Sequence, residues 1–257
     1  MKLVKKYWSV FFLVITLSLF LAACGSSTGS GSSGDKLVVA TDATYAPMEY
    51  MDDSGNIVGI DIDIVDAIAE AAGIEVEYKN YGWEPLFAAV ENGEVDFAVS
   101  SITITDDRKE SFDFTDPYFV ANQVILVPAN SDVESFEELK GKKVAVQINT
   151  TGHEVVKGLL GKTSSDIVAP KTMPLAITEM LNGNADAAVG DNSVVLEYVK
   201  NNPDVELEII EDDSFEKEYY GLMVKKGNSE IVDRLNEGIQ KIKEDGTLKE
   251  LTGMDIE

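Results

Sequence analysis

The sequence predicts an α/β protein in which two similarly built lobes enclose a cleft. From Lys36 onward, short apolar runs alternate with amphipathic stretches, which is the pattern expected where strands and helices alternate. The segment NGEVDFAV at 92–99 is also echoed by NGNADAAV at 182–189, and each copy follows an apolar helix pattern. Because such helix-to-strand passages are common in α/β proteins, chance repetition is the alternative to two lobes of common design.

Strands and helices are predicted in alternation along this part of the chain. Short apolar runs predict strands at 37–40, 74–78, 95–99, 124–127, 143–147, 186–189 and 220–224. Amphipathic stretches predict helices at 62–72, 85–91, 151–160, 175–181, 194–200 and 230–244. Glycines at the predicted helix ends favour C-terminal caps, namely Gly73, Gly93, Gly161, Gly183 and Gly246.

The two echoed strands end in polar or small residues at matching places. Ser100 and Ser101 follow the first strand, and Gly190 and Asp191 follow the second. In open α/β sheets, ligands bind beyond the carboxyl ends of strands, where the topology switches. We therefore expect both strand ends to face one ligand-binding cleft between the lobes.

The N-terminus predicts export and anchoring. Residues 1–23 carry three lysines, an apolar stretch and two alanines, which is typical of a secretory signal; an uncleaved membrane helix is the alternative. Residues 21–24, LAAC, resemble the lipobox of bacterial lipoproteins, whose cysteine becomes the lipid-bearing first residue. Cys24 is the single cysteine, and residues 25–34 contain only Gly, Ser and Thr. Such a segment is a flexible tether spanning about 17 Å.

Composition excludes several classes of function. The 257 residues carry a formal net charge of −25, which becomes 18 − 46 = −28 without the three leader lysines, so nucleic acid is excluded as a partner. One cysteine allows no internal disulfide, and one histidine allows no multi-histidine metal site. We expect no metal and no cofactor. Histidine-dependent catalysis would rest on His153 alone, for which a surface position is expected.

Three groups near the predicted cleft suit the head of an amino acid. Arg108 matches a carboxylate by bidentate hydrogen bonds, with donors from Ser101 and Thr103 beside it; a surface pair with Asp106 or Asp107 is the alternative. The segment 149–152, NTTG, opens a helix whose free N–H groups also suit a carboxylate, or it is a plain N-cap. Asp191 either caps the next helix or faces an ammonium group.

Two aromatic residues and one acid suit the side chain of such a ligand. Tyr45 and Trp83 fall in predicted loops, where they would stack on a ligand and favour a cationic one; core packing is the alternative. Asp42 lies at the mouth of the first strand and would accept hydrogen bonds from the polar tip of the ligand.

From about residue 36 to residue 253 the chain resembles the polar amino acid solute-binding proteins of ABC importers, which have the periplasmic-binding-protein type II fold. The matching stretches are TDATYAP at 41–47, GIDID at 59–63, SSITIT at 100–105 with Arg108, FTDPY at 114–118 and TTG at 150–152. This resemblance implies that Arg108 and the Thr151 N–H bind the carboxylate, and that Asp191, Ser101 and Thr103 hold the ammonium and neighbouring atoms. It implies a sandwich of Tyr45 and Trp83, and hinge strands near 120–124 and 219–222.

Within that family, the segments 80–87, 146–147 and 218–221 are most similar to binders of arginine and other basic amino acids. Enteric glutamine binders carry lysine at the position of Gln147 and histidine at that of Gly190, and the absence of both here weakens the glutamine-binder alternative. Gln147 is among the predicted ligand-binding residues. Asn149 departs from the glycine of many members and would alter the carboxylate loop. Asp42 is shared by binders of different specificity.

The predicted organisation is a signal peptide at 1–23, a lipidated Cys24 with a linker to 34, one lobe from 35–120 with 221–257, and a second lobe at 121–220. We expect a non-enzymatic protein, lipid-anchored on the outer face of the bacterial membrane. It would capture free arginine, lysine or histidine for an ABC permease. The alternatives are a glutamine or cystine binder, a cyclohexadienyl-dehydratase-like enzyme using His153, and the sensor lobe of a receptor.

Overall fold

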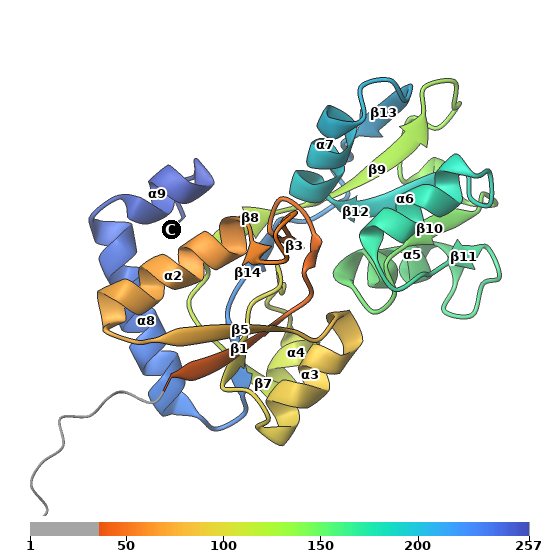
Figure 1. Ribbon diagram of the computed structural model, residues 1–257. Coiled ribbons are helices and arrows are strands. Elements are labelled where there is room, and N and C mark those ends of the chain that lie inside the picture. Colours follow the sequence, from red (N-terminus) through yellow and green to blue (C-terminus); the bar gives the residue numbers. More distant parts are fainter. Residues whose placement is uncertain (1–35, 257) are drawn as a thin grey trace, which may run out of the picture. The chain divides into compact units, whose positions relative to one another are not determined.

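Two five-stranded sheets organise the computed structural model, which describes residues 36–256 (Figure 1). The first sheet has the order β5-β1-β6-β15-β7, formed by Val76–Asn80, Leu37–Thr41, Phe97–Ala98, Met223–Lys225 and Phe112–Phe114. The second has the order β11-β10-β12-β9-β13, formed by Ile167–Val168, Val144–Val146, Ala187–Asp191, Gln123–Pro128 and Leu207–Ile210. The two sheets lie in different lobes, so the predicted two-lobed α/β class is confirmed.

The two sheets share one pattern of strand directions. β1 pairs in parallel with β5 and β6, and β10 pairs in parallel with β11 and β12. The echoed strands β6 and β12 each pair on their other side with an antiparallel strand, β15 and β9 respectively. The sequence echo therefore marks the same position in two sheets of common topology, and chance repetition is the wrong alternative.

Helices cover both sheets, and the longer ones lie close to the predicted ranges, whereas the short helices at 106–111, 137–139 and 247–252 were not predicted. In the first lobe they are α2 (Ile60–Ala72), α3 (Trp83–Asn92), α4 (Asp106–Ser111), α8 (Ser229–Glu244) and α9 (Thr247–Thr252). In the second they are η1 (Glu137–Leu139), α5 (Thr151–Leu160), α6 (Met173–Leu181) and α7 (Asn192–Asn201). α2 ends at Gly73 with φ 66°, a left-handed conformation in which its N–H reaches back to two helix carbonyls. α8 approaches α2 so closely that a Cβ at Gly238 would lie 2.5 Å from the Ile68 carbonyl oxygen.

The chain passes twice between the sheets along a separate pair of strands. β8 (Phe119–Ala121) and β14 (Glu218–Tyr220) pair antiparallel, with Val120 opposite Tyr219. The single strand predicted at 220–224 is divided, because the Gly221 N–H turns to the carbonyl of Ile102 before β15 begins. A small sheet of β2 (Thr44–Tyr45), β3 (Glu49–Met51) and β4 (Ile57–Val58) lies beside this crossing.

The predicted leader, Cys24 and its linker lie outside the described residues. Between residues 36 and 256, no helix is long and apolar enough to span a membrane. In the same range, no group of three or more His, Cys, Asp or Glu residues has an arrangement that would hold a metal ion.

Candidate functional site

A pocket of about 320 Å³ lies between the carboxyl ends of strands from both sheets. It brings together all nine ligand-binding residues predicted from the sequence. Three further residues complete its wall, Glu49, Ser100 and Thr150. Its lining residues are Asp42, Tyr45, Glu49, Trp83, Ser100, Ser101, Thr103, Arg108, Gln147, Thr150, Thr151 and Asp191.

Arg108 supplies the cation of the pocket. Arg108 lies in the first turn of α4, where its backbone N–H donates a hydrogen bond to the Thr105 hydroxyl at 3.2 Å. Its guanidinium donates to the Thr103 carbonyl at 2.8 Å and lies 5.4 Å from the centroid of the Trp83 ring. No carboxylate among residues 36–256 forms a salt bridge with it, and Asp106 pairs with Lys109 instead. The surface-pair alternative is therefore wrong, and burial lowers the pKa of Arg108.

The loop before α5 lies opposite Arg108. The Thr150 hydroxyl caps the helix by accepting the His153 N–H at 3.1 Å. Within the described part of the chain, no hydrogen bond uses the Thr151 N–H, which lies at the positive end of the helix dipole. Asn149 has φ 58°, and its N–H donates to His153 Nδ1 at 3.0 Å. The expected surface position of His153 is wrong, because this histidine is buried where it supports the loop.

Asp191 supplies an acidic group from the second lobe. It occupies the N-cap position of α7 but makes no side-chain cap hydrogen bond, so the plain-cap alternative is wrong. Its carboxylate accepts hydrogen bonds from Gln123 Nε2 at 2.6 Å and from the Tyr220 hydroxyl. Burial, followed by the negative charge of Glu218, raises the pKa of Asp191 to about 6.

The wall of the pocket also presents hydrogen-bond acceptors. Asp42 is 3% exposed and accepts a hydrogen bond from the Thr44 hydroxyl at 3.0 Å, and burial raises its pKa. Gln147 donates its amide to the Lys171 carbonyl at 3.1 Å, while its Oε1 atom is buried without a protein partner. Tyr45 and Trp83 are each 8% exposed and line the space beside them. The Asp42 carboxylate and the Gln147 Oε1 atom therefore suit a ligand group that donates several hydrogen bonds.

A buried acid pair supports the floor of the pocket. Asp61 accepts the Ser101 N–H at 2.7 Å and the Tyr118 hydroxyl at 3.0 Å, and Glu49 accepts the Ser100 hydroxyl at 2.9 Å. Burial raises the pKa of Asp61 to about 6 and raises that of Glu49 well above its usual value. Because two adjacent buried carboxyls do not both ionise, the pair retains a proton. This pair fixes Ser101 in its left-handed conformation, with φ 49°.

Residues 37–253 match the family model of bacterial extracellular solute-binding proteins, family 3. The chain belongs to this family. A probable histidine-binding protein of Neisseria gonorrhoeae is 40% identical over 235 residues, which cover 89% of this chain and 88% of that protein. The arginine-binding extracellular protein ArtP of Bacillus subtilis (strain 168) is 32% identical over 247 residues, 96% of this chain and 96% of that protein.

A solved structure of this type supports the same assignment. The arginine-, lysine-, histidine-binding protein ArtJ from Geobacillus stearothermophilus matches with a TM-score of 0.81 and 48% sequence identity, covering 84% of this chain and 93% of that one. The non-enzymatic class and the type II fold expected from the sequence agree with this solute-binding family.

Sequence reasoning missed four functional groups of this solute-binding protein. Glu49 and Asp61 were not assigned roles, although Asp61 falls in the matched GIDID motif. Gln123 and Glu218 were also missed; Gln123 begins β9 of the second sheet, and Glu218 begins β14, which joins the lobes. Glu218 falls in the segment 218–221, whose similarity to basic amino acid binders could have indicated a role in the site.

Proposed function

We propose that this chain is the solute-binding protein of an ABC importer for basic L-amino acids, with arginine, lysine or histidine as its ligand. The observation that carries this proposal is the opposition of charges in one pocket. Arg108 offers a cation without a salt-bridge partner among residues 36–256, and Asp191 offers an acid from the other lobe. Such a pair is complementary to the carboxylate and ammonium of an amino acid.

Four further residues of the pocket are complementary to a basic ligand side chain. The Asp42 carboxylate and the Gln147 Oε1 atom are acceptors, and a guanidinium, ammonium or imidazole group supplies donors to them. Tyr45 and Trp83 add aromatic faces that favour a cation. ArtP is named as an arginine-binding protein and ArtJ as an arginine-, lysine-, histidine-binding protein, and these relatives support the same ligand class.

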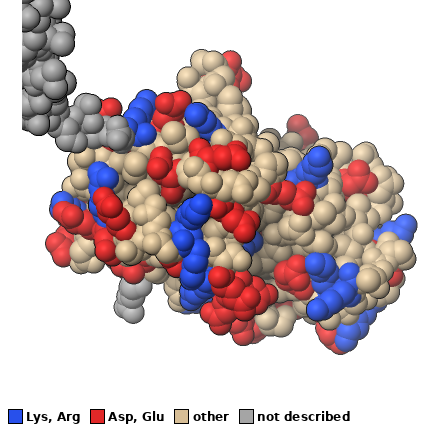
Figure 2. Space-filling view, turned by 90° about the horizontal axis from the view of Figure 1, so that it is seen from below, with Lys and Arg blue, Asp and Glu red and all other residues tan. Residues whose placement is uncertain are grey.

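We propose that ligand binding closes the lobes around a hinge formed by β8 and β14, with lobes at 35–120 plus 221–257 and at 121–220. A permease would then recognise the closed form. Cys24 and the linker at 25–34 would hold the protein at the outer face of the membrane. Acidic side chains dominate the charged surface (Figure 2), but salt screens their attraction for a cationic ligand beyond about 8 Å.

A thermal-shift screen of the twenty amino acids and cystine tests this function. We expect arginine, lysine or histidine to raise the melting temperature most, since at equal concentration the ligand that binds the folded state most tightly stabilises it most. Stabilisation by glutamine or cystine alone would overturn the basic ligand class. Turnover of a prephenate-like substrate would instead favour the dehydratase alternative.

A further inference from the structure

The carboxylate of Glu218 joins hydroxyl groups from both lobes. Glu218 begins β14, one of the two strands by which the chain passes between the sheets (Figure 1). Its Oε2 atom accepts the Thr103 hydroxyl at 2.6 Å and the Thr151 hydroxyl at 2.7 Å. Thr103 follows the first sheet, and Thr151 opens α5 on the second. Both threonines line the pocket, whereas Glu218 lies behind them.

These hydrogen bonds determine what each hydroxyl presents to a ligand. A hydroxyl has one proton, and a carboxylate only accepts hydrogen bonds. The hydroxyls of Thr103 and Thr151 therefore donate their single protons to Glu218, and toward any other partner they can act only as acceptors. Gln123 Nε2 lies 3.4 Å from the Thr151 oxygen, but its two protons go to the shorter contacts with Glu218 and Asp191.

Gln123 extends the same network to Asp191. Its Nε2 group donates to Glu218 Oε1 at 2.9 Å and to Asp191 Oδ1 at 2.6 Å. Gly152 makes room for this amide, since a Cβ at that position would lie 2.7 Å from Gln123 Oε1. The amide thus bridges two acids and fixes Glu218 on the side of the pocket that carries Asp191.

We propose that Glu218 is a positioning residue that sets the direction of hydrogen bonding at the head-group site. By taking the protons of Thr103 and Thr151, it makes their hydroxyls acceptors for the ligand ammonium. The ligand carboxylate is left to Arg108 and to the Thr151 N–H. This inference rests on the proposed function, and it explains how one pocket separates the two ends of a zwitterion.

The arrangement has a consequence for selectivity. A site built to receive hydrogen bonds rejects an analogue that lacks the donor, because its acceptors are then left buried and unpaired. For arginine, the analogue without the ammonium is 5-guanidinopentanoic acid, and the analogue without the carboxylate is agmatine. We expect Glu218 to affect the preference for arginine over 5-guanidinopentanoic acid, but not the preference for arginine over agmatine.

Calorimetric titration of the wild type and of Glu218→Gln with these three compounds tests the proposal. The amide keeps one oxygen and replaces the other with an NH2 group. Because Gln123 Nε2 donates to the Oε1 side, the oxygen belongs there and the NH2 group takes the place of Oε2, where the Thr103 and Thr151 hydroxyls must turn round and accept. We expect Glu218→Gln to weaken arginine binding about tenfold, and to reduce the preference for arginine over 5-guanidinopentanoic acid by about the same factor. The preference for arginine over agmatine should stay within about twofold of the wild type.

Glu208→Gln is the matched control, because it removes the same charge from an exposed position on β13. Thermal unfolding without ligand checks that each variant is folded. Should Glu218→Gln fail to fold, Thr103→Val carries the same test, since it removes one of the two proposed acceptors. In a folded Glu218→Gln background, Thr103→Val should have a smaller effect than in the wild type.

Two results would overturn the proposal. One is equal weakening of all three compounds, which would mean that Glu218 only shapes the hinge. The other is a Glu218→Gln variant that behaves like Glu208→Gln. Failure of the wild type to bind arginine, lysine and histidine would instead count against the proposed function. If lysine or histidine binds and arginine does not, the comparison uses that amino acid with its own two analogues.

Discussion

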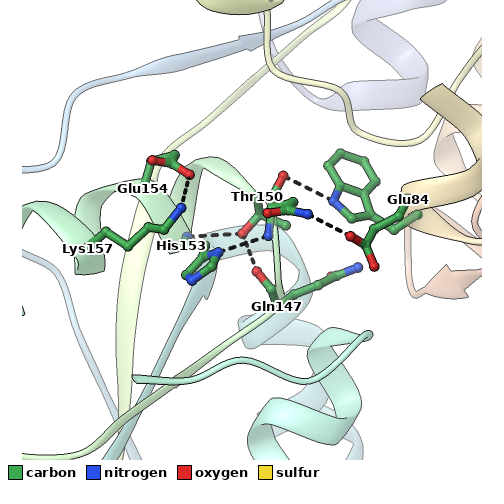
Figure 3. Close-up of polar contacts among 8 residues, drawn as sticks. Glu84, Gln147, Thr150, His153, Glu154 and Lys157 are labelled. Atoms are coloured by element: carbon green, nitrogen blue, oxygen red, sulfur yellow. Dashed lines mark hydrogen bonds and ion pairs between the residues drawn. The ribbon is translucent and has the colours of Figure 1, made fainter. Parts of the chain in front are cut away.

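The indole Nε1 of Trp83 donates a hydrogen bond to the carbonyl oxygen of Asn149 at 3.2 Å, which connects α3 of the first lobe with the loop before α5 of the second. The Asn149 side chain also donates to Glu84 Oε1 at 2.7 Å, and Figure 3 shows Glu84 directed toward the loop of Thr150 and His153. Asn149 therefore joins the two lobes by both its backbone and its side chain.

Asn149→Gly tests whether this contact stabilises the closed form. Glycine keeps the left-handed backbone but removes the side-chain amide. We expect weaker binding by about 2- to 10-fold, the same factor for every ligand, and a correspondingly faster dissociation measured by stopped-flow fluorescence. Glu84→Gln, which weakens the same hydrogen bond from the other side, should behave similarly. An unchanged dissociation rate in both variants would contradict this role.

Arg108→Ala should weaken amino acid binding at least about 30-fold, because truncating one partner of a buried charge pair costs about 2 to 5 kcal/mol. Arg234→Ala removes an exposed arginine of α8 and is the matched control. Calorimetry measures both variants. Equal affinities for the two would remove Arg108 from the binding site.

Binding should weaken as the pH falls through about 6. Asp191 binds an ammonium best as a carboxylate, and its pKa without ligand is raised to about 6 by burial and by Glu218. From pH 7.5 to pH 5 we expect the dissociation constant for arginine to rise about tenfold. Binding at pH 6 should also release protons, measured by calorimetry in buffers of different ionisation enthalpy. Affinity that is independent of pH in this range would contradict the role of Asp191.

The buried acid pair should make the protein less stable as the pH rises from about 4 to about 6. The pKa of Asp61 is raised to about 6 by burial, so the folded state binds more protons than the unfolded state in this window. Asp61→Asn removes this titration while keeping an acceptor for Ser101. Between pH 4.5 and pH 7, the free energy of unfolding of the wild type should fall relative to this variant by on the order of 1 to 3 kcal/mol, as measured by urea denaturation. Parallel pH profiles would show that the pair does not titrate as described.

Sequence patterns predicted the parts of the fold that depend on local periodicity. The helices at 62–72 and 151–160 and the echoed strands were found because apolar spacing and terminal glycines mark them. The strand predicted at 220–224 is divided at Gly221, since a long-range bond to Ile102 turns the chain there. Edge strands of two residues, such as β11, carry too short a pattern to be recognised.

The pocket residues were predictable for a different reason. Arg108 and Asp191 follow buried strands, where α/β topology gathers side chains at one edge. The roles of Glu49, Asp61 and Glu218 were not predictable, because each depends on a partner distant in the sequence. Glu218 is 115 positions from Thr103, and no local pattern specifies that pairing.

A crystal structure of the protein with bound L-arginine tests the central claim most directly. The account predicts that the Arg108 guanidinium lies within hydrogen-bond distance of the ligand carboxylate, while Asp191 lies within the same distance of its ammonium. An arginine molecule bound with its head group away from both residues, or in the reverse orientation, would contradict it.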